Sequence, residues 1–256
     1  MEKENKNTLS VIIIAKNEET EIGECIKALS FADEIIVVDS ESTDKTVKIA
    51  KEAGAKVVIR PFHDFASQRN IGYALARTTW ILYIDADERV SAGLATEIKA
   101  AICSEKFDAY EIQRKNFYFK KYAWPKIEKM QRLFRKSEFI EWFGAVHESP
   151  RIKTNMIGLL KNFLLHYTHS DLKSMVEKTN NWSEIESELI FRSNHPTMKE
   201  WRFLRIMVTK FYDSYISQAG WKAGIVGLIE SIYQSYSYFI VYAKLWERQK
   251  NTNNRN

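Results

Sequence analysis

The chain has 256 residues, and its 38 Lys and Arg against 33 Asp and Glu give a net charge of +5 and a pI near 9.0. A 28% charged and 45% hydrophobic composition with 33 aromatic residues excludes a disordered chain, and the length suits one large domain or a domain with an appendage. Two cysteines, Cys25 and Cys103, exclude a disulfide framework, and we expect both to be reduced thiols in the core.

The amino-terminal segment, 1–8, is charged and polar, which predicts neither a signal peptide nor a transit peptide. The stretch nearest to a spanning helix, 225–243, contains Glu230 and falls short of the roughly 18 uncharged apolar residues that a span needs. We therefore expect a cytoplasmic protein. A surplus of five positive charges is modest for nucleic-acid binding, so its distribution along the chain matters more than its size.

Short β-branched runs alternate with helical patterns over the first hundred residues, which is typical of a parallel sheet with crossover helices. The runs are apolar throughout, as expected for strands that are covered on both faces. The pattern predicts strands at 11–14, 35–38, 56–60 and 80–84, with helices at 19–29, 43–53 and 65–76.

The pattern changes after residue 85. A predicted helix at 92–102 is followed by strands at 109–114, 131–135 and 156–167, which favour a mixed sheet with an antiparallel extension. After about residue 171 only helical signals remain. Two apolar stripes with helical spacing mark this region: Trp201, Leu204, Val208, Phe211 and Tyr215, and then Ile225, Ile229, Ile232, Tyr236, Phe239, Ala243 and Trp246.

Polar side chains follow three of the predicted parallel strands. Asn17 and Glu18 follow the first strand, Asp39 the second, and Asp85 and Asp87 the fourth. The carboxyl ends of such strands border the ligand crevice of an open sheet, and carboxylates suit a hard divalent cation. Each segment also has a structural alternative, because acids and hydroxyl side chains favour the first residues of helices.

No glycine-rich phosphate loop follows the first strand, so a nucleotide bound here needs side chains and a metal ion. Arg69 is a candidate cation near a phosphate. An exposed helix charge is the equally good alternative for this residue.

Four ordered motifs resemble the inverting glycosyltransferases of family 2. The resemblance covers roughly residues 8–170. A finer similarity to the lipopolysaccharide core β-1,4-glucosyltransferase branch rests on Val146-His147-Glu148 and on the aromatic tail 242–247. In one place the chain departs from the family, since Ala15-Lys16 stands where members often have a proline, which loosens the expected geometry of the first loop. The four motifs are SVIIIAKNE (10–18), VDSESTD (38–44), QRNIG (68–72) and WILYIDAD (80–87).

The resemblance implies a GT-A fold, an α/β Rossmann-like mixed sheet flanked by helices, with a C-terminal helical extension. The GT-A domain is expected over 1–170, with a donor half at about 8–105 and an acceptor half at about 106–170, and the helical region over 171–256. The implied donor is a UDP-sugar, with UDP-glucose as the first choice. The implied roles are base recognition for Asp39, nucleoside contact for Asn17 and Glu18, base or diphosphate contact for Arg69, the ribose and metal side for Asp85, and binding of Mn²⁺ or Mg²⁺ for Asp87.

Inversion needs a base on the opposite face of the sugar to take the acceptor hydroxyl's proton, and burial can raise a carboxylate's pKa towards neutrality. Glu148 is the candidate base, because it has apolar neighbours in sequence and matches the family's position for this group. The alternative is a loop acid paired with Arg151. Glu141 and Asp171 are reserve candidates.

Two histidines are candidate ligands. His166 is a candidate metal ligand, because Mn²⁺ accepts imidazole, and the alternative is a hydrogen-bonded structural histidine. His147 is a candidate contact for the acceptor or a phosphate.

Positive charge is concentrated at 111–136, where nine Lys and Arg face two Glu, and five aromatic residues are interleaved. We expect this basic band to meet an anionic membrane surface or a phosphorylated glycolipid acceptor, with a solvated loop as the alternative. The last 86 residues hold 14 of the 33 aromatics. Trp and Tyr suit an interface, so we expect part of this tail to lie on the inner face of the cytoplasmic membrane, beside the acceptor entrance; packing on its own domain is the alternative.

The sequence thus predicts a metal-dependent inverting glycosyltransferase that moves a hexose to a hydroxyl of a lipopolysaccharide-core or other lipid-linked acceptor. One alternative is transfer to a polyprenyl phosphate, whose anionic oxygen needs little help from a base. Another is a non-catalytic nucleotide-sugar-binding scaffold. We expect no nucleic-acid partner, because the acids converge where phosphates would have to lie.

Overall fold

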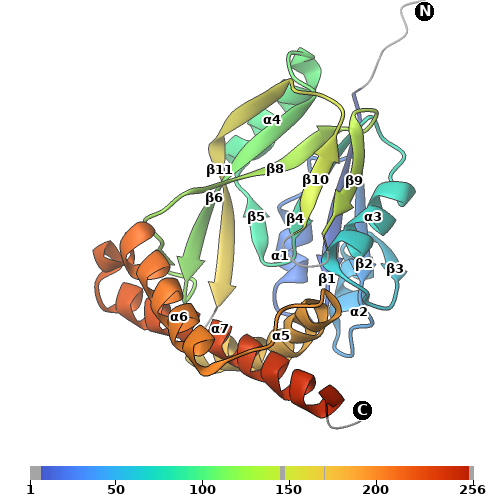
Figure 1. Ribbon diagram of the computed structural model, residues 1–256. Coiled ribbons are helices and arrows are strands. Elements are labelled where there is room, and N and C mark those ends of the chain that lie inside the picture. The colour runs from blue at the N-terminus through green and yellow to red at the C-terminus, as the bar shows by residue number, and fades with distance from the viewer. Residues whose placement is uncertain (1–6, 145–147, 170, 254–256) are drawn as a thin grey trace, which may run out of the picture. The chain divides into compact units, whose positions relative to one another are not determined.

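A computed structural model describes residues 7–144, 148–169 and 171–253 (Figure 1). Its contacts divide the chain into two compact units. The sheet unit contains Met1–Lys115 and Glu128–His166, and the helical unit contains Asn116–Ile127 and Tyr167–Asn256.

The sheet unit begins with four parallel strands in the order β3-β2-β1-β4. Crossover helices join them, as the alternating pattern predicts. The elements are β1 (Leu9–Ala15), α1 (Ile22–Lys27), β2 (Glu34–Asp39), α2 (Thr46–Glu52), β3 (Lys56–Ile59), α3 (Phe65–Leu75) and β4 (Trp80–Asp85).

An antiparallel half follows, in the order β8-β6-β11-β5, with β8 paired to β4. A separate hairpin joins β9 to β10. These elements are β5 (Glu88–Val90), α4 (Ala92–Ser104), β6 (Ala109–Tyr118), β8 (Glu128–Arg135), β9 (Phe139–Phe143), β10 (Ser149–Ile152) and β11 (Ile157–His169).

The core lies on both faces of the parallel strands. Alternate residues of β1 divide between two clusters, so that Val11 and Ile13 belong to one and Ile12 to the other. Side chains of α1 and α4 complete the first cluster, and Trp142 and Phe139 of β9 contribute to the second. This two-sided burial explains why the strand sequences are apolar throughout.

The helical unit contains α5 (Leu172–Arg192), α6 (Glu200–Tyr212) and α7 (Gly224–Asn253), and α7 packs against both other helices. A π-helical turn (Asp213–Ser217) and a 3-10 turn (Gly220–Ala223) connect α6 to α7. In the segment before Ile127, β7 (Tyr122–Ala123) pairs with the end of β6, and Tyr118 and Trp124 pack against Val226. Among the described helices, none has the length and apolar character to cross a membrane.

The predicted α/β mixed sheet with a C-terminal helical extension is confirmed. The strands β5, β7, β9 and β10 were not predicted, because they are short and lack a sustained apolar run. The first two helices are shorter than predicted, since their first residues form the loops after β1 and β2. The prediction that both cysteines are core thiols is wrong for Cys103, which is exposed near the end of α4, while Cys25 is buried.

Candidate active site

The first feature of the site is the alignment of the strand ends. The register pairs Asp39 with Ala15 and Asp85 with Ile14. Because β2 and β4 flank β1 in parallel, the two acids lie on either side of the carboxyl end of β1. The sequence-based expectation that these acids share one sheet edge is confirmed.

The loops after β1 and β2 are held together by their own polar side chains. Buried Asp39 accepts hydrogen bonds from the Ser42 backbone nitrogen (2.9 Å) and hydroxyl (2.5 Å). Asn17 adopts a left-handed conformation (φ 55°), and its Oδ1 accepts from the Thr43 nitrogen at 2.8 Å. The Glu18 carbonyl accepts from the Ile22 nitrogen at 2.9 Å, at the start of α1. These contacts shape the loops, and the roles of Asn17, Glu18 and Asp39 in nucleotide recognition stay predictions.

Arg69 joins two acids that are far apart in the sequence. Its Nη2 donates to Asp85 Oδ1 at 2.8 Å, and its Nε donates to Glu148 Oε1 at 3.0 Å. Its guanidinium carbon lies 5.1 Å from the centre of the Trp142 ring, within the range of a cation–π contact. Arg69 is only 3% exposed, so the alternative of an exposed helix charge is wrong.

The neighbours of Arg69 in the QRNIG motif fix α3 in place. Asn70 donates to the Trp142 carbonyl and accepts from the Trp142 nitrogen, both at 2.8 Å. Gly72 lies so close to β1 that a Cβ atom there would be 2.2 Å from Ile12 Cγ2. The motif therefore ties α3 to both the parallel sheet and β9, and Arg69 is positioned by these contacts.

A second guanidinium group holds the other side of Asp85. Arg132 Nη2 donates to Asp85 Oδ2 at 2.9 Å, and the Asp85 nitrogen donates to the buried Glu88 carboxylate at 2.8 Å. Burial alone would raise the pKa of Asp85, but Arg132, Arg69 and Arg114 hold it well below its usual range. Asp85 is therefore an ionised hydrogen-bond acceptor.

The network continues from Glu88 into the antiparallel half of the sheet. Arg114 donates to Glu88 at 3.1 Å and to Glu128 at 2.6 Å. The Nη1 atoms of Arg69 and Arg132 are buried, and neither has a hydrogen-bond partner within the described residues. Two donors beside Asp85 thus remain for an additional acceptor.

Asp87 and His166 face each other beside this network. His166 Nε2 lies 3.3 Å from Asp87 Oδ2, and the antiparallel pairing of β5 with β11 sets His166 opposite Glu88. Burial lowers the pKa of His166, but the Asp87 carboxylate outweighs burial and raises it above its ordinary value. The predicted metal ligands are therefore brought together although 79 positions separate them.

The described residues do not form a complete metal cage. No group of three or more His, Cys, Asp or Glu side chains converges among them in a way that would hold an ion. One carboxylate and one imidazole nevertheless fit an ion that takes its remaining ligands from substrate phosphates and water, which is how Mg²⁺ and Mn²⁺ are commonly bound.

The reserve bases have other partners. Arg151 pairs with Glu141 at 2.7 Å, and the arginine that pairs with Glu148 is Arg69 rather than the neighbouring Arg151. Asp171 caps α5 by accepting from the Ser174 nitrogen at 2.7 Å. His147 lies outside the described residues.

The roles of Glu88, Arg114 and Arg132 were missed by the sequence-based reasoning. The only signal was the acid that directly follows Asp85-Ala86-Asp87. Three cations of the basic band at 111–136 form ion pairs within the sheet unit: Arg114, Arg132 and Arg135. Their charge balances acids of the fold.

The sequence and the fold are similar to those of known proteins. Residues 10–164 match the family described as Glycosyl transferase family 2. An uncharacterised glycosyltransferase of Rickettsia conorii is 30% identical, over 99% of this chain and 95% of its own length. A lipopolysaccharide core biosynthesis glycosyltransferase of Rhizobium meliloti, LpsC, is 27% identical, over 95% of this chain and 93% of its own.

Among solved structures, residues 1–349 of S. aureus TarS, in complex with UDP-GlcNAc, superpose with a TM-score of 0.50 at 15% identity, covering 96% of this chain and 92% of that one. At this identity the likeness concerns the fold.

Proposed function

Since the chain belongs to glycosyl transferase family 2, we propose that it is a metal-dependent inverting enzyme that moves a hexose from a UDP-sugar to a hydroxyl of a lipopolysaccharide-core or other lipid-linked glycan. Glucose is the first donor sugar to test, from the resemblance of the motifs. The similarity to LpsC over nearly the whole chain supports the acceptor class. We also propose that residues 1–170 carry the donor and acceptor halves and that the enzyme acts at the inner face of the cytoplasmic membrane.

The observation that carries this proposal is the ion-pair chain from Asp85 through Arg69 to Glu148. It joins the acid at the strand ends, where the donor is expected, to the candidate base. Arg69 fixes the direction of the Glu148 carboxylate, so that a base is oriented before the acceptor hydroxyl arrives. Glu148 then takes the hydroxyl proton as the acceptor oxygen attacks the sugar from the face opposite the nucleotide.

Departure of the nucleoside diphosphate leaves negative charge beside the strand ends. The Arg69 and Arg132 guanidinium groups lie within hydrogen-bond distance of Asp85, and each keeps a buried nitrogen without a partner in the described residues. Preformed donors of this kind stabilise charge as it develops, because they need no reorganisation during the reaction.

Asp87 and His166 are the residues that would hold Mn²⁺ or Mg²⁺. A divalent ion there supplies positive charge at the diphosphate. Asp87 offers a carboxylate oxygen, and His166 offers its Nε2 when it is not protonated. The two side chains are largely buried, so their directions are set by the surrounding sheet.

Replacement of the candidate base tests the proposal. In Glu148→Gln, transfer from UDP-glucose should fall by about 10²- to 10⁴-fold, because the amide keeps the shape of the side chain and cannot take a proton. The matched control is Glu141→Gln, which removes a half-exposed acid from the neighbouring hairpin and should leave the rate within about twofold of wild type. Turnover close to wild type in Glu148→Gln would remove this residue as the base.

The same preparation separates the alternatives. A polyprenyl-phosphate acceptor is already anionic, so transfer to it should survive Glu148→Gln. A scaffold should bind UDP but release no sugar from any donor. A thermal-shift screen with UDP-, GDP- and dTDP-sugars in the presence of Mn²⁺ identifies the donor, since a ligand of the native state raises the unfolding temperature.

A further inference from the structure

The helix α6 has an apolar face that nothing in the described residues covers. No residue of α6 is buried. Its most exposed apolar side chains recur at helical spacing on one side: Trp201 is 51% exposed, Leu204 68%, Val208 67% and Tyr212 59%. We call these four residues the α6 face. Isolated apolar residues on a surface are ordinary, but four on successive turns form a contiguous patch.

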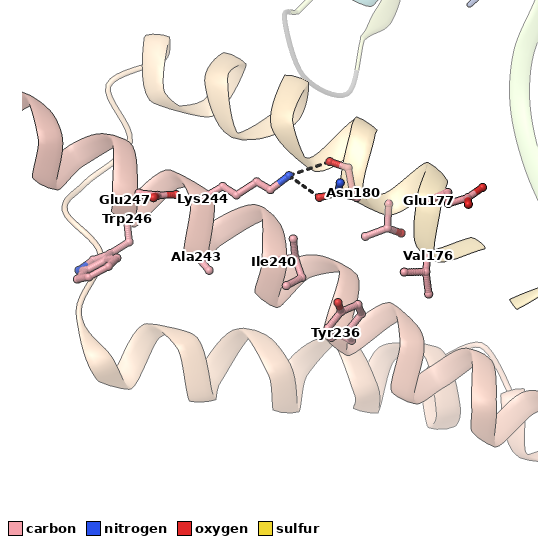
Figure 2. Close-up of a pocket in the computed structure, with 10 residues that line it drawn as sticks. Val176, Glu177, Asn180, Tyr236, Ile240, Ala243, Lys244, Trp246 and Glu247 are labelled. Atoms are coloured by element: carbon pink, nitrogen blue, oxygen red, sulfur yellow. Dashed lines mark hydrogen bonds between the residues drawn. The ribbon is translucent and has the colours of Figure 1, made fainter. Parts of the chain in front are cut away.

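The apolar stripe of α7 is largely exposed as well. Ile225, Ile232, Tyr236 and Trp246 belong to it, and all four are exposed. Tyr236 and Trp246 also line a groove of about 590 Å³ between α5 and α7, with Val176 on the opposite helix (Figure 2). Both stripes that the sequence marks as helical therefore have exposed members, so they do not coincide with the packed faces of the helices.

Polar side chains occupy part of the interior of the helical unit. Its packed positions include small hydroxyl side chains and an acid, which contribute little apolar area and allow close approach of the helices. Ser214 and Ser231 lie 3.0 Å apart, and the Ser231 hydroxyl also donates to the Gly227 carbonyl at 2.7 Å. Among the described residues, the buried polar side chains of the unit are Asn116, Ser183, Ser187, Ser214, Glu230, Ser231 and Ser235. The unit thus exposes large apolar side chains on α6 and α7, while small polar side chains share its interior with apolar ones such as Val241 and Leu245.

Cations accompany the exposed tryptophans. Arg202 and Arg205 lie 5.1 and 5.4 Å from the centre of the Trp201 ring. Lys222 lies 5.4 Å from Trp221, and Lys250 lies 5.8 Å from Trp246. An aromatic ring beside a flexible cation suits the boundary between lipid chains and anionic headgroups.

The net charge of the helical unit also favours an anionic lipid surface. The helical unit holds 15 Lys and Arg against 9 Asp and Glu, a net charge of +6, whereas the sheet unit holds 23 against 24, a net charge of −1. The positive surplus of the whole chain therefore belongs to the unit that carries the α6 face.

We propose that the α6 face is a docking surface for an anionic phospholipid bilayer, on which α6 lies parallel to the membrane plane. The four apolar side chains enter the headgroup boundary, and Arg202 and Arg205 contact the lipid phosphates. This inference deepens the proposed function, because a lipid-linked acceptor lies in such a surface. Only the biological purpose of the membrane binding rests on the proposed function.

Vesicle binding tests this inference without donor or acceptor. Purified full-length protein is sedimented with vesicles of phosphatidylcholine alone or of phosphatidylcholine mixed with phosphatidylglycerol, which gives the vesicles a negative surface. The test variant is Leu204→Glu/Val208→Glu. The matched control is Ile59→Glu/Met156→Glu, which places two acids at exposed apolar positions of the sheet unit. Because all four side chains are about half exposed or more, we expect both variants to fold, which circular dichroism checks.

We expect wild type and control to bind the anionic vesicles alike, and the α6 variant to bind at least tenfold more weakly. Equal binding by wild type and the α6 variant, or no binding of wild type at low salt, would overturn the inference. Light scattering tests whether a second copy of the chain binds the α6 face instead. If wild type is a dimer that binds no vesicles, and the α6 variant is a monomer, the face belongs to that second copy.

Donor hydrolysis separates this inference from the proposed function. The α6 variant should hydrolyse UDP-sugar at the wild-type rate while losing vesicle binding. If wild type binds vesicles through α6 but hydrolyses no nucleotide sugar, the docking surface stands and the proposed function fails.

Discussion

The buried acid Glu230 should make the stability of the protein depend on pH. It is fully buried in α7, where Gln234 donates to its carboxylate at 2.6 Å. Burial raises the pKa of Glu230 from its ordinary value of 4.5 to about 7, although contacts with Gln234 and Tyr118 favour the charged form. In Glu230→Gln, a neutral amide of nearly the same shape replaces a group that loses its proton near physiological pH.

Proton linkage determines the direction in which pH changes the free energy of unfolding. Between pH 4.5 and about 7, the native state holds a proton that the unfolded state has already lost. The free energy of unfolding therefore falls as the pH rises through this range. The destabilisation by the ionised Glu230 carboxylate is absent below pH 4.5 and complete above about pH 7. A difference of roughly 2.5 pK units corresponds to about 3 kcal/mol, since one unit is worth about 1.4 kcal/mol.

Urea unfolding at pH 5 to 8, followed by tryptophan fluorescence, measures the effect. The helical unit contains five of the seven tryptophans, so the signal reports mainly on the unit that holds Glu230. Between pH 5 and pH 8, the free energy of unfolding should fall by about 2 to 3 kcal/mol less in Glu230→Gln than in wild type. Glu247→Gln, which removes an exposed acid of the same helix, should keep the wild-type slope. Identical slopes in wild type and Glu230→Gln would refute the argument.

Three further substitutions address the sheet unit. Arg69→Lys should lower transfer at least tenfold and destabilise the native state by about 2 kcal/mol, because an ammonium group cannot hold two carboxylates in the geometry of a guanidinium; retention of the wild-type rate would contradict this. Gly72→Ala should cost about 1 to 3 kcal/mol in urea unfolding through its clash with Ile12, and an unchanged midpoint would show that α3 has room to move. Asp87→Asn should weaken Mn²⁺ activation of donor hydrolysis at least tenfold, as measured by metal titration, whereas equal titration curves would exclude Asp87 as a ligand.

The parallel half of the sheet could be predicted because its signals are local. Each strand is a short β-branched run, and the acids follow the runs directly, so chain order alone places Asp39 and Asp85 at one edge. The Arg69–Glu148 contact could not be predicted in this way, since 79 positions and an unpredicted hairpin separate the two residues. The apolar neighbours of Glu148 and the family resemblance pointed to Glu148, but nothing in the sequence pointed to Arg69 as its partner.

The helices of the C-terminal region could be predicted from the sequence, but not which of their faces are packed and which are exposed. Apolar spacing identifies a helix and one of its faces, but spacing does not say whether protein, lipid or solvent covers that face. Here Leu204 and Val208 are exposed, while Ser187 and Ser231 are buried. A serine at a packed position has no hydrophobic signature, so the part of the interior that serines form cannot be recognised from apolar stripes.

The charges around Asp85 argue for a cation in addition to the arginines. Three guanidinium groups in this network face four carboxylates, and Asp87 adds a fifth carboxylate whose partner His166 is neutral in the form that binds a metal. The diphosphate of the proposed donor brings at least two more negative charges, which the arginines offset only in part because they already pair with protein acids. A divalent ion held by Asp87 and His166 would restore the balance, so donor binding and metal binding should each strengthen the other by the same factor. The members of the network are Arg69, Arg114, Arg132, Asp85, Glu88, Glu128 and Glu148.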